Sequence, residues 1–68
     1  MFFEYELIQS GIVKIEIFDL VGHQVLEIKN ETQAPGSYTI PVTLNEKGLF
    51  FLRMNVNGAV KTFKLVNN

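Results

Sequence analysis

Hydrophobic and polar residues alternate most regularly along the last twenty residues of the chain. Two runs, 48–56 and 59–66, flank the dipeptide Asn57-Gly58. Asn-Gly is a strong signal for a type I′ hairpin turn, because both central residues of that turn need a positive φ. A two-residue loop also fixes how the two strands pair. The pairs on one face are then Val56 with Ala59, Met54 with Lys61, Leu52 with Phe63 and Phe50 with Leu65, and they are nearly all apolar.

The opposite face of this predicted hairpin is mostly polar. A slip of one residue would exchange the two faces, so the register is well specified. Phe51 is the exception, and two interpretations are open: a loop or the alkyl stem of Lys64 covers the ring, or Phe51 and Val60 form a small patch for a partner protein. The pairs on this face are Asn55 with Val60, Arg53 with Thr62 and Phe51 with Lys64.

The rest of the chain alternates in shorter runs between turn residues, and no segment has a helical period. Six strands spaced about 8–12 residues apart predict an all-β sandwich or small barrel. The further predicted strands are 2–8, 12–18, 23–28 and 37–44, with a polar loop at 29–36. The residues expected to face inward are Phe3, Tyr5, Leu7, Val13, Ile15, Ile17, Tyr38, Ile40, Val42 and Leu44.

Turn chemistry supports these boundaries. The segment Asp19-Leu20-Val21-Gly22 predicts a type I turn. Asp19 can accept hydrogen bonds from the backbone ahead of it, and Gly22 can adopt the left-handed conformation of a bulge. Pro41 falls on the outward set of its strand, which places that strand at a sheet edge.

Composition narrows the function classes. The 68 residues form one domain, 1–68, with a net charge of -1, so nothing in the charge indicates a nucleic acid or an anionic membrane as partner. Cysteine is absent, which excludes a disulfide framework and a thiolate metal site. No apolar run reaches the roughly 18 residues that span a bilayer. The acidic N-terminal segment 1–6 does not look like a signal peptide, so we expect any export signal to lie on a longer precursor.

The residues indicate no catalytic, cofactor or metal site and no small-molecule substrate. The single histidine, His23, has only Asp19 as a candidate partner and is expected to be solvated. Glu4, Glu6 and Glu16 fall on polar strand faces, where solvation is the expected role. The chain has neither a Gly-x-Ser-x-Gly elbow nor a glycine-rich phosphate loop.

Four motifs keep a common order and spacing over nearly the whole chain. They are Tyr5-Glu6-Leu7 followed by Ser10-Gly11 and 13–22, the Gly-x-Tyr strand within 34–40, the Gly-Leu-Phe-Phe strand at 48–54 and the lysine-bearing strand at 61–66. Together they resemble the type A C-terminal sorting domain of the type IX secretion system, with which Bacteroidetes send proteins across the outer membrane. The immunoglobulin-like domain of the flagellar hook-capping protein shares the first two motifs and is the main alternative to this resemblance.

The resemblance implies an all-β, immunoglobulin-like antiparallel sandwich of six to seven strands, without chemistry or cofactor of its own. It would follow an N-terminal cargo domain in a secreted precursor. Its implied partners are the outer-membrane translocon, a shuttle protein and a sortase-like component that anchors cargo to lipopolysaccharide. The domain would pass through the periplasm to the cell surface. The implied recognition residues are Gly48, Phe51, Arg53, Lys61, Lys64 and Val66.

Two other classes stay open from the sequence alone. One is a general immunoglobulin-like spacer, accessory or binding module of a secreted enzyme or adhesin, and the other is a small stand-alone enzyme. The edge strands of so small a sandwich also leave backbone groups unpaired, so we expect that an edge-strand dimer or strand addition by a partner is possible.

Overall fold

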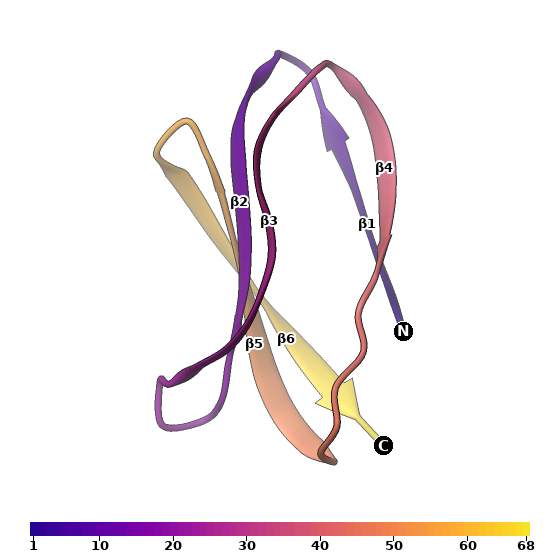
Figure 1. Ribbon diagram of the computed structural model, residues 1–68, viewed down its shortest axis with the longest axis vertical. Helices are drawn as coiled ribbons and strands as arrows, with labels where there is room; N and C mark the ends of the chain where they lie inside the picture. The colour runs from indigo at the N-terminus through magenta and orange to yellow at the C-terminus, as the bar shows by residue number, and fades with distance from the viewer.

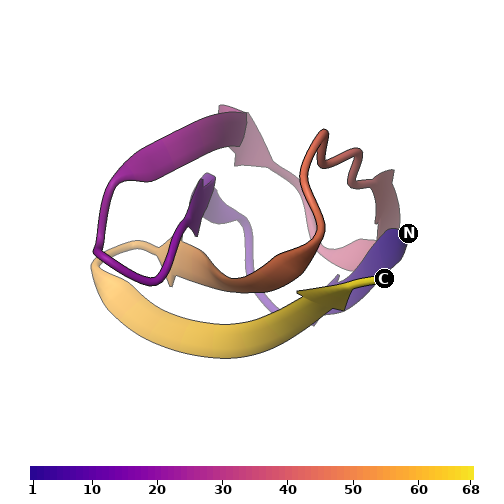
Figure 2. The same cartoon turned by 90° about the horizontal axis from the view of Figure 1, so that it is seen from below.

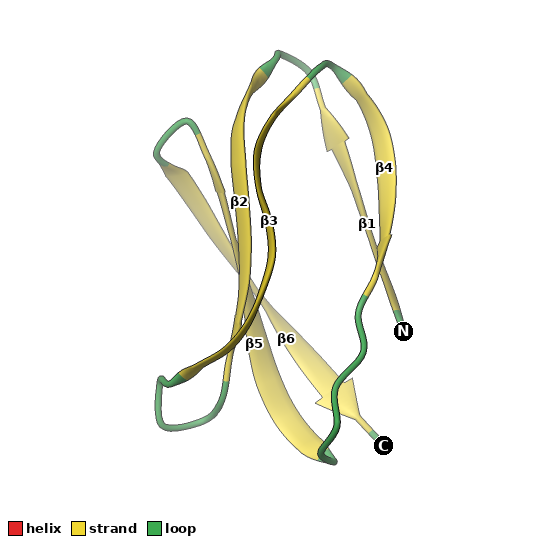
Figure 3. Cartoon of the chain, viewed as in Figure 1, coloured by secondary structure: helices red, strands yellow, loops and turns green.

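The computed structural model describes residues 1–68, and every regular element in it is a β-strand (Figure 3). No regular element is an apolar helix of membrane-spanning length. The strands are β1 (Phe2–Leu7), β2 (Gly11–Phe18), β3 (Gln24–Gln33), β4 (Gly36–Pro41), β5 (Gly48–Val56) and β6 (Ala59–Asn67).

The six strands form two antiparallel sheets. One sheet pairs β1 with β4, and the other has the order β3-β2-β5-β6. Figures 1 and 2 show the small sheet lying across one face of the larger one, which gives a sandwich. This order corresponds to strands B–E and C′–C–F–G of an immunoglobulin fold. The predicted all-β sandwich is confirmed.

The core lies between the two sheets. Four strands, β1, β2, β4 and β5, contribute side chains to it. Within each strand every second residue points to the same face, so alternate residues enter the core. Ile15 and Leu52 have no exposed surface, and Phe50 is also buried. The other core residues are Tyr5 and Leu7 of β1, Val13 and Ile17 of β2, and Ile40 and Val42 on and just after β4. Phe3, Tyr38 and Leu44 pack against this cluster, so the predicted inward set is confirmed.

The terminal hairpin has the predicted register throughout, from Val56 opposite Ala59 to Phe50 opposite Leu65. Asn57 and Gly58 have φ values of 52° and 89°, as a type I′ turn requires. The predicted inner face is less well covered on β6 than on β5, however. Phe63 is 38% exposed and meets mainly the ring of Phe3, with 5.2 Å between centroids. The small sheet has only two strands and does not extend over the whole of β6 (Figure 2).

The third strand is longer than the alternation predicted. β3 continues through residues 29–33, which the sequence analysis assigned to a polar loop, and pairs with β2 as far as Gln33 opposite Gly11. Two register shifts interrupt the ladder, between Ile15 and Glu16 and between Ile17 and Phe18. An edge strand needs a partner on only one side, so its side chains can stay polar. The polar residues at 29–33 therefore gave no alternation from which this part of β3 could be predicted.

The fourth strand is shorter than predicted. β4 ends at Pro41, whereas the alternation extended to Leu44. Pro41 is exposed, and β4 is an edge strand of the small sheet, as the proline indicated. Val42 still continues the pairing in part, because its backbone N–H donates to the carbonyl of Met1 at 2.7 Å.

Candidate functional site

The two strands of the terminal hairpin carry every predicted recognition residue, and the confirmed register divides these residues between two faces, as the predicted pairing implied. Phe51, Arg53, Lys64 and Val66 lie on the outer face of the four-stranded sheet, away from the core. Lys61 pairs with Met54 and points to the opposite side. There it lines a cleft together with Glu6, Leu7, Ile8, Val56 and Ala59. Gly48 begins β5 with a φ of 131°.

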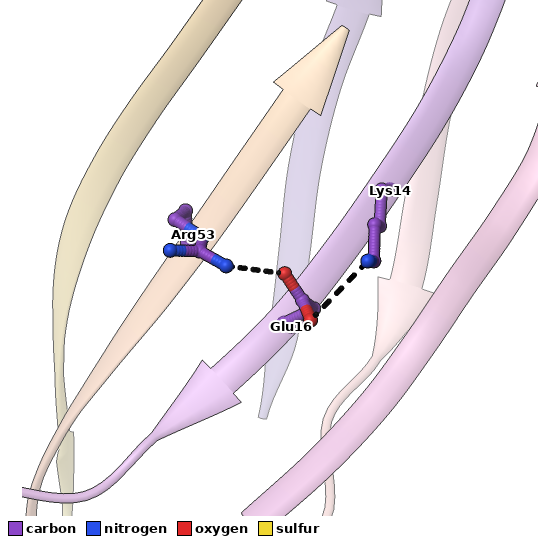
Figure 4. Close-up of polar contacts among 3 residues, drawn as sticks. All are labelled: Lys14, Glu16 and Arg53. Atoms are coloured by element: carbon purple, nitrogen blue, oxygen red, sulfur yellow. Dashed lines mark hydrogen bonds and ion pairs between the residues drawn. The ribbon is translucent and has the colours of Figure 1, made fainter. Parts of the chain in front are cut away.

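Arg53 is held in a defined position on the outer face. Its Nη2 donates to Oε1 of Glu16 at 2.9 Å across the β2–β5 pair (Figure 4). Its guanidinium also lies over the ring of Phe18, 4.6 Å from the ring centroid. Lys14 approaches the other oxygen of the same carboxylate at 3.7 Å. A charge-assisted hydrogen bond and a cation–π contact together fix the plane of this arginine.

Glu16 corrects a prediction. Its position on a polar strand face predicted a solvated side chain, but only 4% of its surface is exposed. Neighbouring strands cover it from both sides, since β2 lies between β3 and β5 and the side chains of Lys14 and Arg53 bridge to its carboxylate. Glu4 and Glu6 are exposed, as expected. The burial of Glu16 could have been predicted only from the pairing of β2 with β5, and the local sequence pattern does not indicate that pairing.

The structure agrees in part with each of the two interpretations that the sequence left open for Phe51. The residue is half-buried, opposite Phe18 on β2 and opposite Lys64 on β6. Phe18 was not among the predicted site residues. The pairing of β2 with β5 brings the two rings to the same face and extends the apolar area toward the centre of the sheet.

Both ends of the hairpin are tied to the rest of the domain. At the turn, Asn57 accepts a hydrogen bond from the N–H of Ile12 through its side chain at 2.9 Å and donates its own N–H to the carbonyl of Ile12 at 3.1 Å. At the other end, Nδ2 of Asn67 donates to the carbonyls of Leu44 and Glu46 at 3.2 and 2.6 Å. The hairpin is therefore a fixed surface of the domain.

The predicted turn at 19–22 is confirmed in its hydrogen bonds. Oδ1 of Asp19 accepts from the backbone N–H of Val21 at 3.0 Å and of His23 at 2.9 Å. Gly22 has a φ of 89°, in the left-handed region. The side chain of His23 is 80% exposed, and its Nδ1 lies 3.8 Å from Oδ2 of Asp19. Asp19 thus serves the turn, and His23 lies in solvent as expected.

The other buried polar side chains form hydrogen bonds within the domain. The hydroxyl of Tyr5 donates to Oε1 of the buried Gln33 at 2.5 Å. Burial raises the pKa of the Tyr5 phenol above its ordinary value. No group of three or more His, Cys, Asp or Glu side chains is arranged to hold a metal ion.

Charge is distributed unevenly between the hairpin and the rest of the chain. Residues 48–68 contain Arg53, Lys61 and Lys64 and no acidic residue, whereas all seven acids lie within 1–47. The exposed face of β1 presents Glu4 and Glu6. The sandwich therefore has an acidic face on the small sheet and a basic hairpin at the edge of the large sheet.

Replacing Gly58 with valine should lower the free energy of unfolding by about 1–3 kcal/mol, because a β-branched residue is strained at positive φ. A Cβ at Gly58 would meet no atom within 4 Å, so the loss would report backbone strain alone. Urea denaturation measures it. Ala59→Val adds a side chain at the next, ordinary strand position and should leave stability nearly unchanged. Equal effects of the two substitutions would contradict the turn assignment.

Comparison with known protein families gave a match. The family model described as "Secretion system C-terminal sorting domain" matches residues 3–68. No curated protein and no solved structure matches. The match includes all of the hairpin and the whole core.

Proposed function

This chain belongs to the secretion system C-terminal sorting domain family, and we propose that its β5–β6 hairpin is the part that the secretion machinery recognises. The chain is a non-catalytic signal domain of a type IX secretion cargo, and secretion machinery must recognise such a domain. The general spacer module that the sequence left open has the same fold, but the family match accounts for nearly the whole chain.

The hairpin has the properties that an address on many different cargoes needs. It is fixed to the domain at both ends through Asn57 and Asn67. Its outer face combines half-buried aromatic surface with exposed cations at Arg53 and Lys64. A rigid surface loses little conformational entropy when a partner binds it. The observation that carries the proposal is this basic, aromatic face without a single acid on either strand.

The finer steps follow from the family. The domain would pass through the periplasm behind its N-terminal cargo domain and reach the cell surface. The outer-membrane translocon and a shuttle protein would bind it, and a sortase-like component would remove it while anchoring the cargo to lipopolysaccharide. Gly48, Phe51, Arg53, Lys61, Lys64 and Val66 remain the recognition residues of this proposal.

The edge-strand dimer expected from the sequence remains a prediction. β6 is an edge of the four-stranded sheet, so one side of its backbone has no strand partner. Lys61 and Lys64 project from this strand. Charged side chains on an edge oppose pairing between identical strands, which makes a different partner the better candidate for that edge.

The proposal is tested by export of a reporter protein fused before residues 1–68 in a Bacteroidetes host. We expect the reporter at the cell surface or in the medium when the type IX translocon is present, and in the periplasm when its gene is deleted. A reporter that stays in the periplasm in both strains would refute the proposal. A fusion without residues 48–68 controls for leakage of the reporter.

The double substitution Lys61→Glu/Lys64→Glu should block export while the domain stays folded. Both lysines are exposed and take part in none of the ion pairs of the structure, so reversing their charge should affect recognition more than stability. Lys47→Glu is the control for a single charge reversal outside the hairpin, because Lys47 is also exposed but lies in the loop before β5. Normal export of the double variant would remove both lysines from the recognition site.

A further inference from the structure

One charged residue of the chain, Glu16, is buried, and it lies on the outer face of the four-stranded sheet rather than in the core. Glu16 projects to the outer side of the four-stranded sheet, opposite Arg53. Its side chain is 6% exposed, whereas that of Arg53 is 46% exposed. A partner can therefore reach the guanidinium but not the carboxylate beneath it.

We propose that Arg53 is the cation that selects an acidic surface of the secretion machinery, and that Glu16 is the residue that positions it. This inference rests on the proposed function of the hairpin. A guanidinium has five N–H donors, and Glu16 is the only side chain of the domain that accepts a hydrogen bond from Arg53. The remaining donors can form a fork with a carboxylate of the partner.

The charges around Arg53 define the chemistry of the partner. On β2, β5 and β6 the charged residues of the outer face other than Glu16 are Lys14, Arg53 and Lys64, which are all positive. Glu27 is the remaining acid of this face and lies on β3, directly opposite Glu16. A surface that offers carboxylates would meet three cations and no accessible anion over these strands.

The residues beside the cations add an apolar component. Phe51 and Leu49 are half-buried on β5, and Val66 is exposed on β6. These side chains share the outer face with Arg53 and Lys64. The partner surface that fits is therefore acidic, with apolar groups adjacent to its carboxylates.

Glu16 has a role that net charge alone would not give. An acid on a basic recognition face weakens the attraction of that face for an acidic partner. It also holds the guanidinium over the ring of Phe18 and limits the rotamers that Arg53 would lose on binding. Removing the negative charge of Glu16 therefore has opposite consequences in the two cases. Binding strengthens if only net charge matters and weakens if the position of Arg53 matters.

The experiment measures binding of the labelled chain to outer-membrane vesicles from a host with the type IX translocon and from a strain lacking it. We expect the chain to bind only to vesicles that contain the translocon. The affinity of Glu16→Gln should be about tenfold lower than that of the wild type. High salt should weaken the binding of the wild type as well. Glu27→Gln makes the same change in net charge directly opposite Glu16 on β3 but removes no hydrogen bond to Arg53, so it should leave affinity equal or slightly higher.

Arg53→Lys is the second variant, because it keeps a cation beside Glu16 and so preserves the fold even if Glu16→Gln does not. Lysine lacks the planar fork, so we expect about a tenfold loss of affinity. Unchanged or tighter binding of either folded variant, or binding of the wild type that does not depend on salt, would overturn the inference and leave the proposed function standing. Binding of the wild-type chain to neither vesicle would contradict the proposed function itself. Self-association of the chain that depends on Arg53 would show a second copy as the acidic partner and would also overturn the inference.

Discussion

Replacing Ile15 with alanine is expected to lower the free energy of unfolding by about 2–5 kcal/mol. Ile15 has no exposed surface and lies at the centre of the core, on a strand with neighbours on both sides. The substitution removes apolar contact and leaves a cavity that the surrounding strands cannot fill completely. A domain of this size has a total stability of about 3–10 kcal/mol. The variant should therefore lose a substantial part of the stability of the domain.

Ile12→Ala is the matched control for this prediction. It removes the same atoms from the same strand, but Ile12 is 60% exposed on the outer face. We expect a loss of less than about 1 kcal/mol, because little apolar surface leaves contact. Urea unfolding followed by circular dichroism measures both. Similar losses for the two variants would contradict the assignment of the faces of β2.

The second large effect is expected at the ion pair that joins Arg53 of the hairpin to Glu16 of β2. Arg53→Met should cost about 1–3 kcal/mol, because it leaves the buried carboxylate of Glu16 with Lys14 as its only cation. Breaking a fully buried pair costs about 3–5 kcal/mol. The side chain of Arg53 is half-exposed, so solvent screening reduces the loss.

The double substitution Glu16→Met/Arg53→Met separates the cost of an unpaired charge from the cost of lost packing. Apolar residues of similar length remove both charges, and we expect most of the stability to return. Chemical unfolding of the wild type, Glu16→Met, Arg53→Met and the double variant gives the coupling between the two positions. Additive losses in the double variant would show that the two side chains do not stabilise each other.

The terminal hairpin could be predicted in full because its information is local. The Asn57-Gly58 turn sets the pairing, and the alternation on either side of it assigns each residue to a face. The turn at 19–22 was predictable for the same reason, since Asp19 bonds to backbone groups within four residues. The sandwich followed from the number and spacing of such segments.

The prediction failed where a residue depends on a neighbour distant in the sequence. The segment 29–33 is a strand only because β2 lies beside it, and its polar side chains gave no alternation to detect. Glu16 is buried because β2 lies inside the sheet and Arg53, 37 residues away, bonds to it. The inner side of β6 is partly exposed because the facing sheet has two strands.

For this protein the sequence alone determined which segments are extended, where they turn, how the last two pair and which secretion family they resemble. Side-chain alternation and positive-φ turns act over a few residues, so they can be read along the chain. Only the tertiary structure decided which strands are neighbours. It thereby placed Glu16 beside Arg53 on the outer face of the four-stranded sheet. The physical reason is that burial and charge pairing depend on distances through space, which the order of residues does not fix.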